Sequence, residues 1–388
     1  MQSYDALGIA RAMLPQVRGA RDECERLRHV PPSLAEALAK AGLLQMFLPR
    51  SMGGPELAPL DAFDAIEEIS KVDGSIGWCT MIASVLAAFT GWLPSEVGRS
   101  MGSAGGGTDL RLGGSIRPQG RARLVDGGYR VTGQWDFASG IHHARWVVCP
   151  CVVLEGDKPV LTNTGISKTR IMWLPAESIE IIDTWDVIGL RGTGSHDFAV
   201  RDVFVPQTHT SSLADAPHES GPLYIPRLFL TWVWTATVAN ALGIARGAMN
   251  AFVEMATTKA STSSPTLLRD RALVQARTAE AEAILSAARS YVRGTVAETW
   301  RLVTAGEKDL DVAITQARLA ITHAMHEAAR SVDLVFHAAG TNAVYTRNPI
   351  ERYFRDIHVT LQHGTALPIH MEAAGKALLG LRPSDPGW

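Results

Sequence analysis

The spacing of the hydrophobic residues changes twice along this chain of 388 residues, and this change constrains the fold strongly. From residue 4 to about residue 110, apolar residues recur every three or four positions, which is typical of amphipathic helices. From about 110 to 210 they alternate with polar residues, which is typical of strands. The helical spacing returns at Tyr224, in segments long enough for an antiparallel bundle. The sequence therefore predicts a mainly α protein with a central β-domain, in three domains: 1–109, 110–212 and 213–388.

Charge and composition narrow the range of partners. A formal net charge of −2 and the lack of a basic patch argue against nucleic acid. Four cysteines in a chain of this length are too few for a disulfide framework. The first residues show no basic stretch followed by an apolar one, and no apolar run reaches the roughly 18 residues that cross a membrane. We therefore expect a cytoplasmic protein with neither a nucleic acid nor a membrane as its partner.

A hairpin signal precedes a segment with two aromatic residues and a hydroxyl. Two alternating runs flank the DGG turn at 126–128, and the second run leads into GQWDFASGIHHARW. If the chain stays extended there, Trp135, Phe137 and Ser139 share one face. With Gly140, they would form a flat surface with a donor at its edge, suited to a planar heterocycle such as an isoalloxazine ring. The alternative is a buried sheet face closed by a turn.

The segment RPQGRARLVDGGYRVTGQWDFASGIHHARWVV resembles the middle of flavin-dependent monooxygenases built on the acyl-CoA dehydrogenase fold, the oxygenase components of two-component aromatic hydroxylases. DGSIGW, at 73–78, is similar to the same family, and matching signals extend from about Arg21 to Gly380. The resemblance implies an N-terminal helical domain, a small β-barrel and a C-terminal four-helix bundle that forms the interface of a homo-oligomer, a tetramer or a dimer. It also implies flavin contacts from Trp135, Phe137, Ala138, Ser139 and Gly140.

A glycine-rich run, GLRGTG at 189–194, is followed by a strand-like segment. A dinucleotide-binding fingerprint opens a helix instead, so the sequence does not indicate a Rossmann fold. The stretch DTWDVIGLRGTG resembles the D-x-x-G-x-R-G-[ST] segment of the same monooxygenase family. The resemblance implies that Trp185 lies near the flavin and that Arg191 and Thr193 have structural or flavin-side roles. A turn between strands is the alternative for each of them.

The candidate catalytic residue lies in the last segment. NPIERYFRDIHVTLQHGTALP resembles the end of acyl-CoA dehydrogenases, in which P-x-E-x-x-x-R-D precedes E-G-T and that last Glu removes the substrate α-proton. Here the triplet begins with His363. The register is open by one position, and neither alignment places a carboxylate where the base should be. A neutral imidazole can accept a proton near pH 7 or donate a hydrogen bond to a flavin peroxide. The resemblance implies catalytic roles for His363 and Ser139; a structural role for His363 is the alternative.

A second group of cofactor contacts is implied further along the chain. HAAGTNAV, at 337–344, stands where dehydrogenases carry Q-x-x-G-G-x-G, a loop that reaches the adenosine end of the cofactor in a neighbouring subunit. Gly340 and Asn342 are retained, and Gln275 matches the Gln that follows the dehydrogenase motif R-x-x-F-G. The Arg and Phe of that motif are missing here. This loss is compatible with a reduced flavin that arrives by diffusion, and it leaves FAD and FMN both open.

His142, His143, Cys149 and Cys151 fit no usual zinc spacing, so we expect no metal. The resemblance predicts a reduced-flavin-dependent monooxygenase that hydroxylates an aromatic or heteroaromatic molecule, of phenol or indole type, through a C4a-(hydro)peroxyflavin. Molecular oxygen is the co-substrate, and a separate reductase supplies the flavin. The candidate substrate walls, for which ordinary helix contacts are the alternative, are Trp78, Met81, Phe229, Trp232 and Trp234. Two other functions stay open: an acyl-CoA dehydrogenase or related flavin oxidase, and a non-catalytic binding protein.

Overall fold

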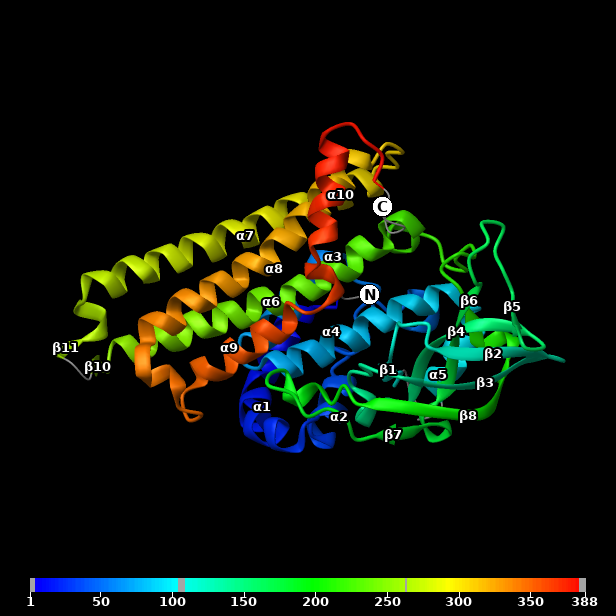
Figure 1. Cartoon of the computed structure of the whole chain (residues 1–388), viewed down its shortest axis with the longest axis horizontal. Coiled ribbons are helices and arrows are strands. Elements are labelled where there is room, and N and C mark those ends of the chain that lie inside the picture. The colour runs from blue at the N-terminus through cyan, green and yellow to red at the C-terminus, as the bar shows by residue number, and fades with distance from the viewer. Residues whose placement is uncertain (1–3, 104–108, 262–263, 384–388) are drawn as a thin grey trace.

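The computed structural model describes residues 4–103, 109–261 and 264–383. Long helices lie side by side at one end of the molecule, and most of the strands lie at the other (Figure 1). Helices come first in the chain, then strands, then helices again. The predicted class, mainly α with a central β-domain, is confirmed.

The helices of the N-terminal part, within the described residues, are α1 (Ala6–Leu27), α2 (Pro32–Lys40), α3 (Pro59–Ser70), α4 (Gly74–Phe89) and α5 (Ser95–Ser103). Asp73 caps α4, because its carboxylate accepts a hydrogen bond from the backbone N–H of Ile76. Every residue of α4 except Ile82 is buried, as its uniform hydrophobicity predicts. Helix α4 is therefore a central helix, enclosed by the rest of the fold.

The strands of the β-domain form one nine-stranded mixed sheet within the described residues, in the order β7-β8-β3-β2-β4-β6-β9, with β1 and β5 paired to β4. Their bounds are β1 (Leu112–Gly114), β2 (Gly120–Val125), β3 (Gly128–Trp135), β4 (Trp146–Glu155), β5 (Lys158–Pro159), β6 (Thr169–Pro175), β7 (Glu180–Ile182), β8 (Asp197–Pro206) and β9 (Thr210–Ser211). Val125 of β2 pairs with Gly128 of β3, which confirms the predicted hairpin. The sheet has a hydrophobic core of its own, separate from the core of the helices.

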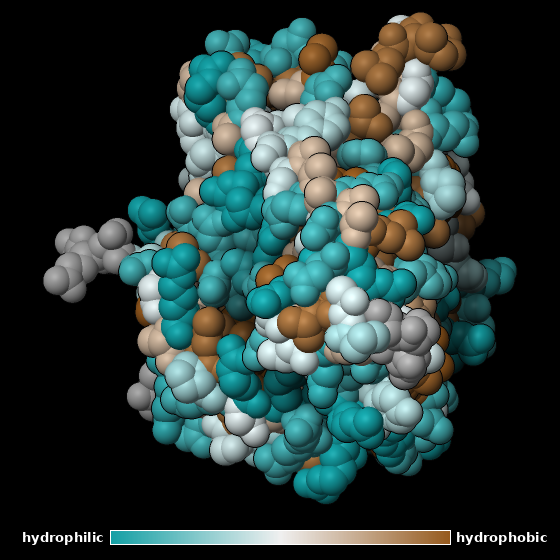
Figure 2. Space-filling model, turned by 90° about the vertical axis from the view of Figure 1, so that its left-hand side faces the viewer, coloured by the Kyte–Doolittle hydropathy of each residue, from teal (hydrophilic) through white to brown (hydrophobic). Residues whose placement is uncertain are grey.

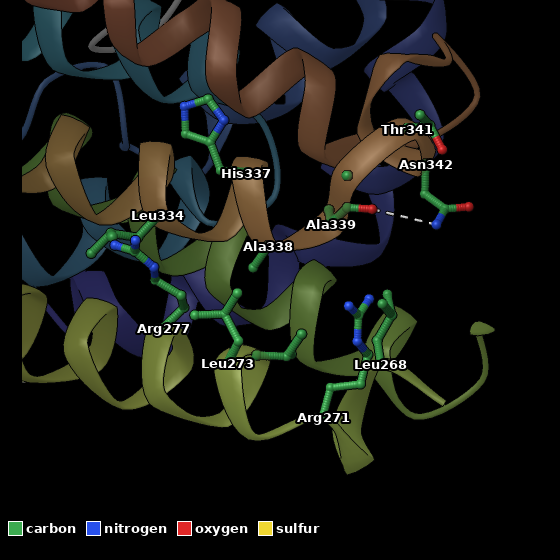
Figure 3. A pocket seen from close by; sticks show the side chains of 12 residues that line it. Leu268, Arg271, Leu273, Arg277, Leu334, His337, Ala338, Ala339, Thr341 and Asn342 are labelled. Atoms are coloured by element: carbon green, nitrogen blue, oxygen red, sulfur yellow. Dashed lines mark hydrogen bonds between the residues drawn. The ribbon is translucent and has the colours of Figure 1, made fainter. Parts of the chain in front are cut away.

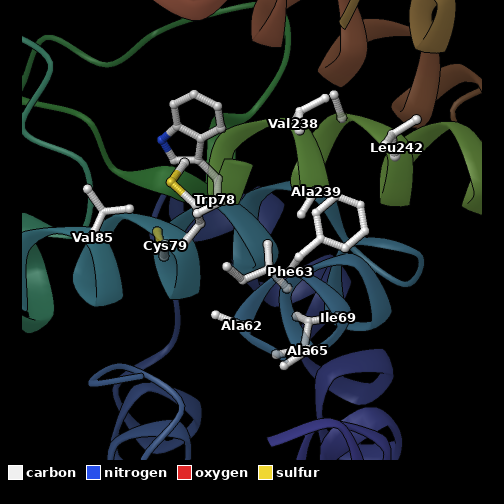
Figure 4. Packing of buried hydrophobic residues seen from close by; sticks show 14 of the residues in the cluster. Ala62, Phe63, Ala65, Ile69, Trp78, Cys79, Val85, Val238, Ala239 and Leu242 are labelled. Atoms are coloured by element: carbon white, nitrogen blue, oxygen red, sulfur yellow. The ribbon is translucent and has the colours of Figure 1, made fainter. Parts of the chain in front are cut away.

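The C-terminal part consists of α6 (Pro226–Ala256), the short strands β10 (Ala260–Ser261) and β11 (Ser264–Leu267), α7 (Ala272–Thr304), α8 (Asp311–Ala339), α9 (Pro349–Thr360) and α10 (Pro368–Leu378). Helix α8 packs against both α6 and α7. Helix α6 also packs against α3, and Figure 4 shows Phe63 of α3 beside Ala239 of α6. Asn240 of α6 donates hydrogen bonds to Ser70 Oγ (2.9 Å) and to the carbonyl of Gly74 (3.0 Å), which ties α6 to α3 and α4.

The predicted domain boundaries fall in connecting segments. Helix α5 ends at Ser103 and β1 begins at Leu112, while β9 ends at Ser211 and α6 begins at Pro226. Most of the glycine-rich segment that indicated the first boundary, 102–107, lies outside the described residues. The boundaries at 109/110 and 212/213 stay predictions.

Two helices correct the expectation about membrane-length apolar segments. Gly74–Trp92 and Pro226–Ala256 are long and apolar enough to cross a membrane by length and composition. Their apolar windows are 94% and 89% buried inside the fold, as expected for core helices. On the end of the molecule shown in Figure 2, hydrophobic residues form small groups separated by hydrophilic ones, which is ordinary for a protein surface.

A buried carboxyl group joins α9 to the β-domain. Asp356 is 1% exposed, and its Oδ1 accepts a hydrogen bond of 2.6 Å from the backbone N–H of Leu190. Burial, with a further contribution from the nearby carboxylate of Asp73, raises the pKa of Asp356 from 3.8 to about 7. The folded protein therefore holds a proton on this group up to near-neutral pH, whereas the unfolded chain releases it near pH 4.

Asp356→Asn should change how stability depends on pH. Between about pH 4 and pH 7 the wild-type folded state binds more protons at this site than the unfolded state, so its stability falls as pH rises. The side-chain oxygen of asparagine can still accept the hydrogen bond from the N–H of Leu190, but asparagine has no carboxyl proton to lose. Urea unfolding at pH 4.5 and pH 8 should show the variant gaining roughly 1–3 kcal/mol relative to wild type at the higher pH. The control is Asp186→Asn, at an exposed carboxylate; parallel pH profiles for wild type and Asp356→Asn would contradict the assignment.

Candidate active site

The segment after β3 does not form the predicted flat face. Strand β3 ends at Trp135, whose indole is fully buried, stacks on Phe198 (ring centroids 5.0 Å apart) and donates its Nε1–H to the carbonyl of Pro150 (2.8 Å). Phe137 has a φ of +56° and is 57% exposed. The chain turns between these residues, so the prediction that Trp135, Phe137 and Ser139 share one face is wrong. The Trp135 side chain belongs to the core of the sheet.

Trp78 of α4 brings together two predicted site residues that are distant in the sequence. Its Nε1–H donates to Ser139 Oγ at 3.1 Å. The edge of the same indole meets the ring of His363, with centroids 5.3 Å apart and planes at 80°. Trp78 and Ser139 are 7% and 5% exposed, and His363 is half-buried. One indole therefore joins the central helix, the segment after β3 and the turn after α9.

Ser139 continues into a series of buried hydroxyl groups. Its Oγ lies 2.7 Å from Ser195 Oγ, which lies 2.7 Å from Thr193 Oγ1. Thr193 in turn donates to the carbonyl of Leu190 at 2.8 Å. Trp185 donates its Nε1–H to the same carbonyl (3.1 Å) and meets the exposed ring of Phe137 edge-on. The predicted residues Ser139, Thr193 and Trp185 thus lie in one connected region.

Hydrogen bonding favours one tautomer of His363. Two groups of Thr365 lie at its Nδ1: the backbone N–H, which donates to it at 3.3 Å, and the side-chain hydroxyl, whose oxygen is 2.9 Å away. A backbone N–H can only donate, so Nδ1 carries no hydrogen and the neutral ring holds its hydrogen on Nε2. Burial lowers the pKa of His363 to about 4. Near pH 7 the imidazole is therefore neutral, with Nε2–H as its donor.

Three side chains hold the turn that carries His363, η10 (Gly364–Ala366). The consecutive carbonyls of Gly364, Thr365 and Ala366 accept hydrogen bonds from His370 Nε2 (2.8 Å), Thr322 Oγ1 (3.1 Å) and His326 Nε2 (2.9 Å). Thr322 and His326 are four residues apart on α8 and so face the turn together. The position of His363 is therefore set by α8 and α10.

The second group of predicted cofactor residues lies elsewhere in the chain. A cavity of about 490 Å³ separates the start of α7 from the end of α8 and η9 (Gly340–Val344), and both Gly340 and Asn342 line it (Figure 3). Arg271 and Arg277 give this cavity basic walls, and His337 also lines it. Gln275 lies on the same stretch of α7 and donates to the carbonyl of Arg269 (3.0 Å). Figure 1 places this end of α7 at the opposite end of the molecule from the sheet.

Only some of the predicted substrate walls adjoin the His363 turn. Trp78 contacts His363, and Trp234 lies against His370, with ring centroids 4.4 Å apart. The other three candidates have different neighbours: Met81 contacts Thr237, Phe229 meets Phe89 and Trp92 edge-on, and Trp232 meets Trp300 edge-on.

The residues around Trp78 include side chains of the kinds that contact a flavin ring. The exposed face of Phe137 beside Trp185 offers aromatic surface, and Ser139 and His363 offer a hydroxyl and a neutral imidazole. Gly140, with a φ of +74°, has no room for a side chain, because a Cβ there would come within 2.9 Å of the His143 ring. Among the described residues, no group of three metal-ligating side chains could hold an ion. The absence of a metal from the working enzyme stays a prediction.

Comparison with known proteins decides the family. Residues 9–92 and 235–367 match the models of the acyl-CoA dehydrogenase N-terminal and C-terminal domains. The chain is 32% identical to indole-3-acetate monooxygenase of Acinetobacter baumannii, over 96% of this chain and 92% of that protein. It is 31% identical to the flavin-dependent monooxygenase oxygenase subunit HsaA of Rhodococcus jostii, over 95% and 94%. The chain belongs to the flavin-dependent monooxygenases of the acyl-CoA dehydrogenase fold.

A solved structure gives the same result for the fold of this monooxygenase. The 3-HSA hydroxylase of Rhodococcus sp. RHA1 superimposes with a TM-score of 0.88 at 29% identity, over 99% of both chains. The match spans the helical parts and the sheet together. The predicted family, its enzymatic nature and its dependence on flavin are therefore confirmed, whereas the role of each site residue stays a prediction.

Sequence patterns did not indicate several residues that build this site. Ser195 follows a glycine-rich turn, and its position two residues after Thr193 is the only signal that both hydroxyls could point the same way. Thr322 and His326 share a helical face, but nothing in the sequence shows that this face meets a turn some forty residues later. These contacts depend on tertiary structure.

Thr322→Val tests the support of the His363 turn. The variant keeps the volume of the fully buried Thr322 but removes the donor to the Thr365 carbonyl. Losing the partner of a buried acceptor should cost roughly 1–3 kcal/mol in the free energy of unfolding, measured with urea. Thr315→Val on the same helix is the control, because its hydroxyl bonds to the carbonyl of Asp311 four residues earlier. Equal losses in the two variants would show that the turn does not depend on Thr322.

Proposed function

We propose that this monooxygenase is the oxygenase component of a two-component system. It hydroxylates an aromatic or heteroaromatic small molecule, of phenol or indole type, with reduced flavin and molecular oxygen. The observation that carries this proposal is the meeting of Ser139 and His363 at the indole of Trp78. The name of the relative indole-3-acetate monooxygenase supports an indole-type ring as substrate.

The flavin, FAD or FMN, supplies the electrons that activate oxygen when it is bound. Phe137, Ala138, Ser139 and Gly140 would hold its ring from the segment after β3, with Trp185 beside them. Trp135 would contribute only its backbone, since its side chain is enclosed in the sheet. Gln275, Gly340 and Asn342 would contact a more distant part of the flavin.

His363 acts as a hydrogen-bond donor in this proposal. Its hydrogen is on Nε2, and its pKa of about 4 makes it a weak base near pH 7. An acyl-CoA dehydrogenase needs a group that removes an α-proton, and a neutral imidazole of this kind is poorly suited to that step. The turn held by Thr322, His326 and His370 keeps the donor in place.

Apolar side chains would exclude water from the reacting groups. Trp78 and Trp234 adjoin the His363 turn and are the primary walls, while Met81, Phe229 and Trp232 would support them from the neighbouring turns of α4 and α6. Aromatic walls favour a planar aromatic substrate through stacked or edge-on contacts.

A separate flavin reductase would be the partner. The name of the relative HsaA, an oxygenase subunit, supports this because it implies another component. We propose that the protein works in the cytoplasm as a homo-oligomer, a tetramer or a dimer. The separation of Gln275, Gly340 and Asn342 from Ser139 within one chain supports an assembly in which a second copy completes the flavin site.

His363→Ala tests the proposed reaction. Without the donor, product formation should fall by roughly 10²–10⁴-fold, the usual contribution of a positioned acid or base. Oxygen should instead leave as hydrogen peroxide, so the ratio of product to hydrogen peroxide should fall when reduced flavin, oxygen and an indole or phenol are mixed. His358→Ala is the control, because His358 pairs with Asp333 on α8 instead of contacting Trp78.

Two results would contradict the proposal. Undiminished product formation by His363→Ala would show that the role of this residue is structural. Reduction of oxidised flavin by an acyl-CoA in the wild type would assign the protein to the dehydrogenases.

A further inference from the structure

The backbone of Trp185, which is proposed to lie beside the flavin, is held on both sides by ionisable side chains. Its N–H donates to His196 Nδ1 at 3.2 Å, and the N–H of Thr184 donates to the same nitrogen, also at 3.2 Å. Its carbonyl accepts from Arg28 at 3.2 Å. Trp185 and His196 are 9% and 3% exposed. The position of Trp185 therefore depends on whether these side chains keep their hydrogen-bonding roles.

These contacts assign the tautomer of His196. A backbone N–H only donates, so Nδ1 carries a lone pair and the hydrogen of the neutral ring is on Nε2. A second proton on the ring can then go only to Nδ1. There it would face the N–H groups of Thr184 and Trp185 as a third donor, so the charged ring can keep neither hydrogen bond. His196 holds this segment only while it is neutral.

The charged ring has a different partner within reach. Asp183 Oδ1 lies 3.3 Å from His196 Nδ1, so a hydrogen on that nitrogen can bond to this carboxylate. The other oxygen of Asp183 is already paired with Arg28, at 2.6 Å. A charged His196 would therefore compete with Arg28 for Asp183 and also release the N–H of Trp185. Protonation exchanges one set of contacts around Trp185 for another.

The other ionisable groups near His196 are two histidines, one cation and two carboxylates: His142, His29, Arg28, Asp183 and Asp197. The ring of His142 meets that of His196 edge-on, with centroids 5.0 Å apart, and His29 stacks on His142 at 4.3 Å. Burial lowers the pKa of His196, the carboxylates oppose this change, and Arg28 and His29 add to it.

The lowered pKa of His196 gives the direction of the pH dependence. Its ordinary value is 6.5, so the ring is neutral at pH 7 and takes up its proton only below 6.5. The unfolded chain binds this proton more readily than the folded protein does. The contacts of neutral His196 therefore stabilise the fold fully above pH 6.5 and are lost as pH falls through the lowered pKa.

We propose that His196 is a positioning residue for the flavin site, which holds the backbone of Trp185 at neutral pH and releases it in acid. At neutral pH the lone pair on Nδ1 holds the N–H groups of Thr184 and Trp185. On acidification Nδ1 changes from an acceptor to a donor, bonds to Asp183 and frees this segment, so flavin is bound more weakly. The inference rests on the proposed function in one respect, the place of Trp185 beside the flavin.

Hydrogen exchange tests this role without any flavin. His196→Asn keeps an oxygen acceptor near the position of Nδ1 but cannot gain a proton. Exchange of the backbone N–H groups of Thr184 and Trp185 is followed by mass spectrometry of the peptide that contains them. At pH 7.5 wild type and His196→Asn should exchange at similar rates. At pH 5.5 wild type should exchange at least about threefold faster, because its segment opens more often.

The affinity for flavin should follow the exchange rates. Dissociation constants of oxidised FAD and FMN are measured between pH 5 and pH 8, and the ratio of wild type to His196→Asn at each pH removes the titration of the flavin itself. The two proteins should bind equally at pH 7.5. At pH 5.5 wild type should bind about three- to tenfold more weakly, the effect of losing one or two hydrogen bonds. Circular dichroism confirms that both proteins are folded at each pH.

Two further variants serve as control and as a test of the second partner. The control is His209→Asn, because burial also lowers the pKa of His209 but its ring stacks on Trp146; its pH profile should match that of wild type. Asp183→Asn removes the carboxylate that would receive the charged ring. The midpoint of the wild-type profile should then move down by roughly half a pH unit.

The outcomes separate this inference from the proposed function. If wild type and His196→Asn exchange alike at both pH values, the inference is wrong and the proposed function stands. The inference is also wrong if His196→Asn loses flavin affinity in acid as wild type does, because another group then titrates. If exchange changes as expected but flavin affinity does not, Trp185 does not lie beside the flavin, and that part of the proposed function is wrong as well.

Discussion

The backbone of Leu190 is the point on which the site depends. Its N–H is bonded to the carboxyl of Asp356 on α9, and its carbonyl accepts from both Thr193 and Trp185. One residue thus ties the C-terminal helices to the β-domain and ends the hydroxyl series that starts at Ser139. To make these contacts, Leu190 adopts a left-handed backbone conformation with a φ of +51°. Its neighbour Gly189 must be glycine, since a Cβ there would lie 2.3 Å from the carbonyl of Arg355.

The two polar groups at Trp78 each have a buried partner behind them. Ser139 Oγ accepts from Trp78 and contacts Ser195 Oγ, and the Nδ1 of His363 accepts from Thr365. In each case a buried contact behind the residue takes up part of its hydrogen-bonding capacity. The chemistry of the site is therefore set by groups that a substrate or cofactor would never touch.

The fold could be predicted from the sequence because it follows from local patterns. The change of hydrophobic spacing located the helices and the sheet, and the uniformly apolar α4 indicated a central helix. The site could be predicted only through resemblance, and the local geometry around Trp135 was wrong because the period of two was extended beyond the end of β3. Neither the contacts of Trp78 with Ser139 and His363 nor the support of the His363 turn by Thr322 has a local signal in the sequence. Both join segments that are far apart in the chain.

Burial slows the exchange of the hydroxyl hydrogens of Ser139, Ser195 and Thr193 with solvent. Thr193 and Ser195 are almost fully enclosed, so their hydrogens cannot meet water while the turn at Leu190 is closed. In heavy water these hydroxyls exchange only when the turn opens, and their exchange rate reports the frequency of that opening. A protein transferred briefly into heavy water therefore keeps ordinary hydrogen along this series after its surface has become deuterated.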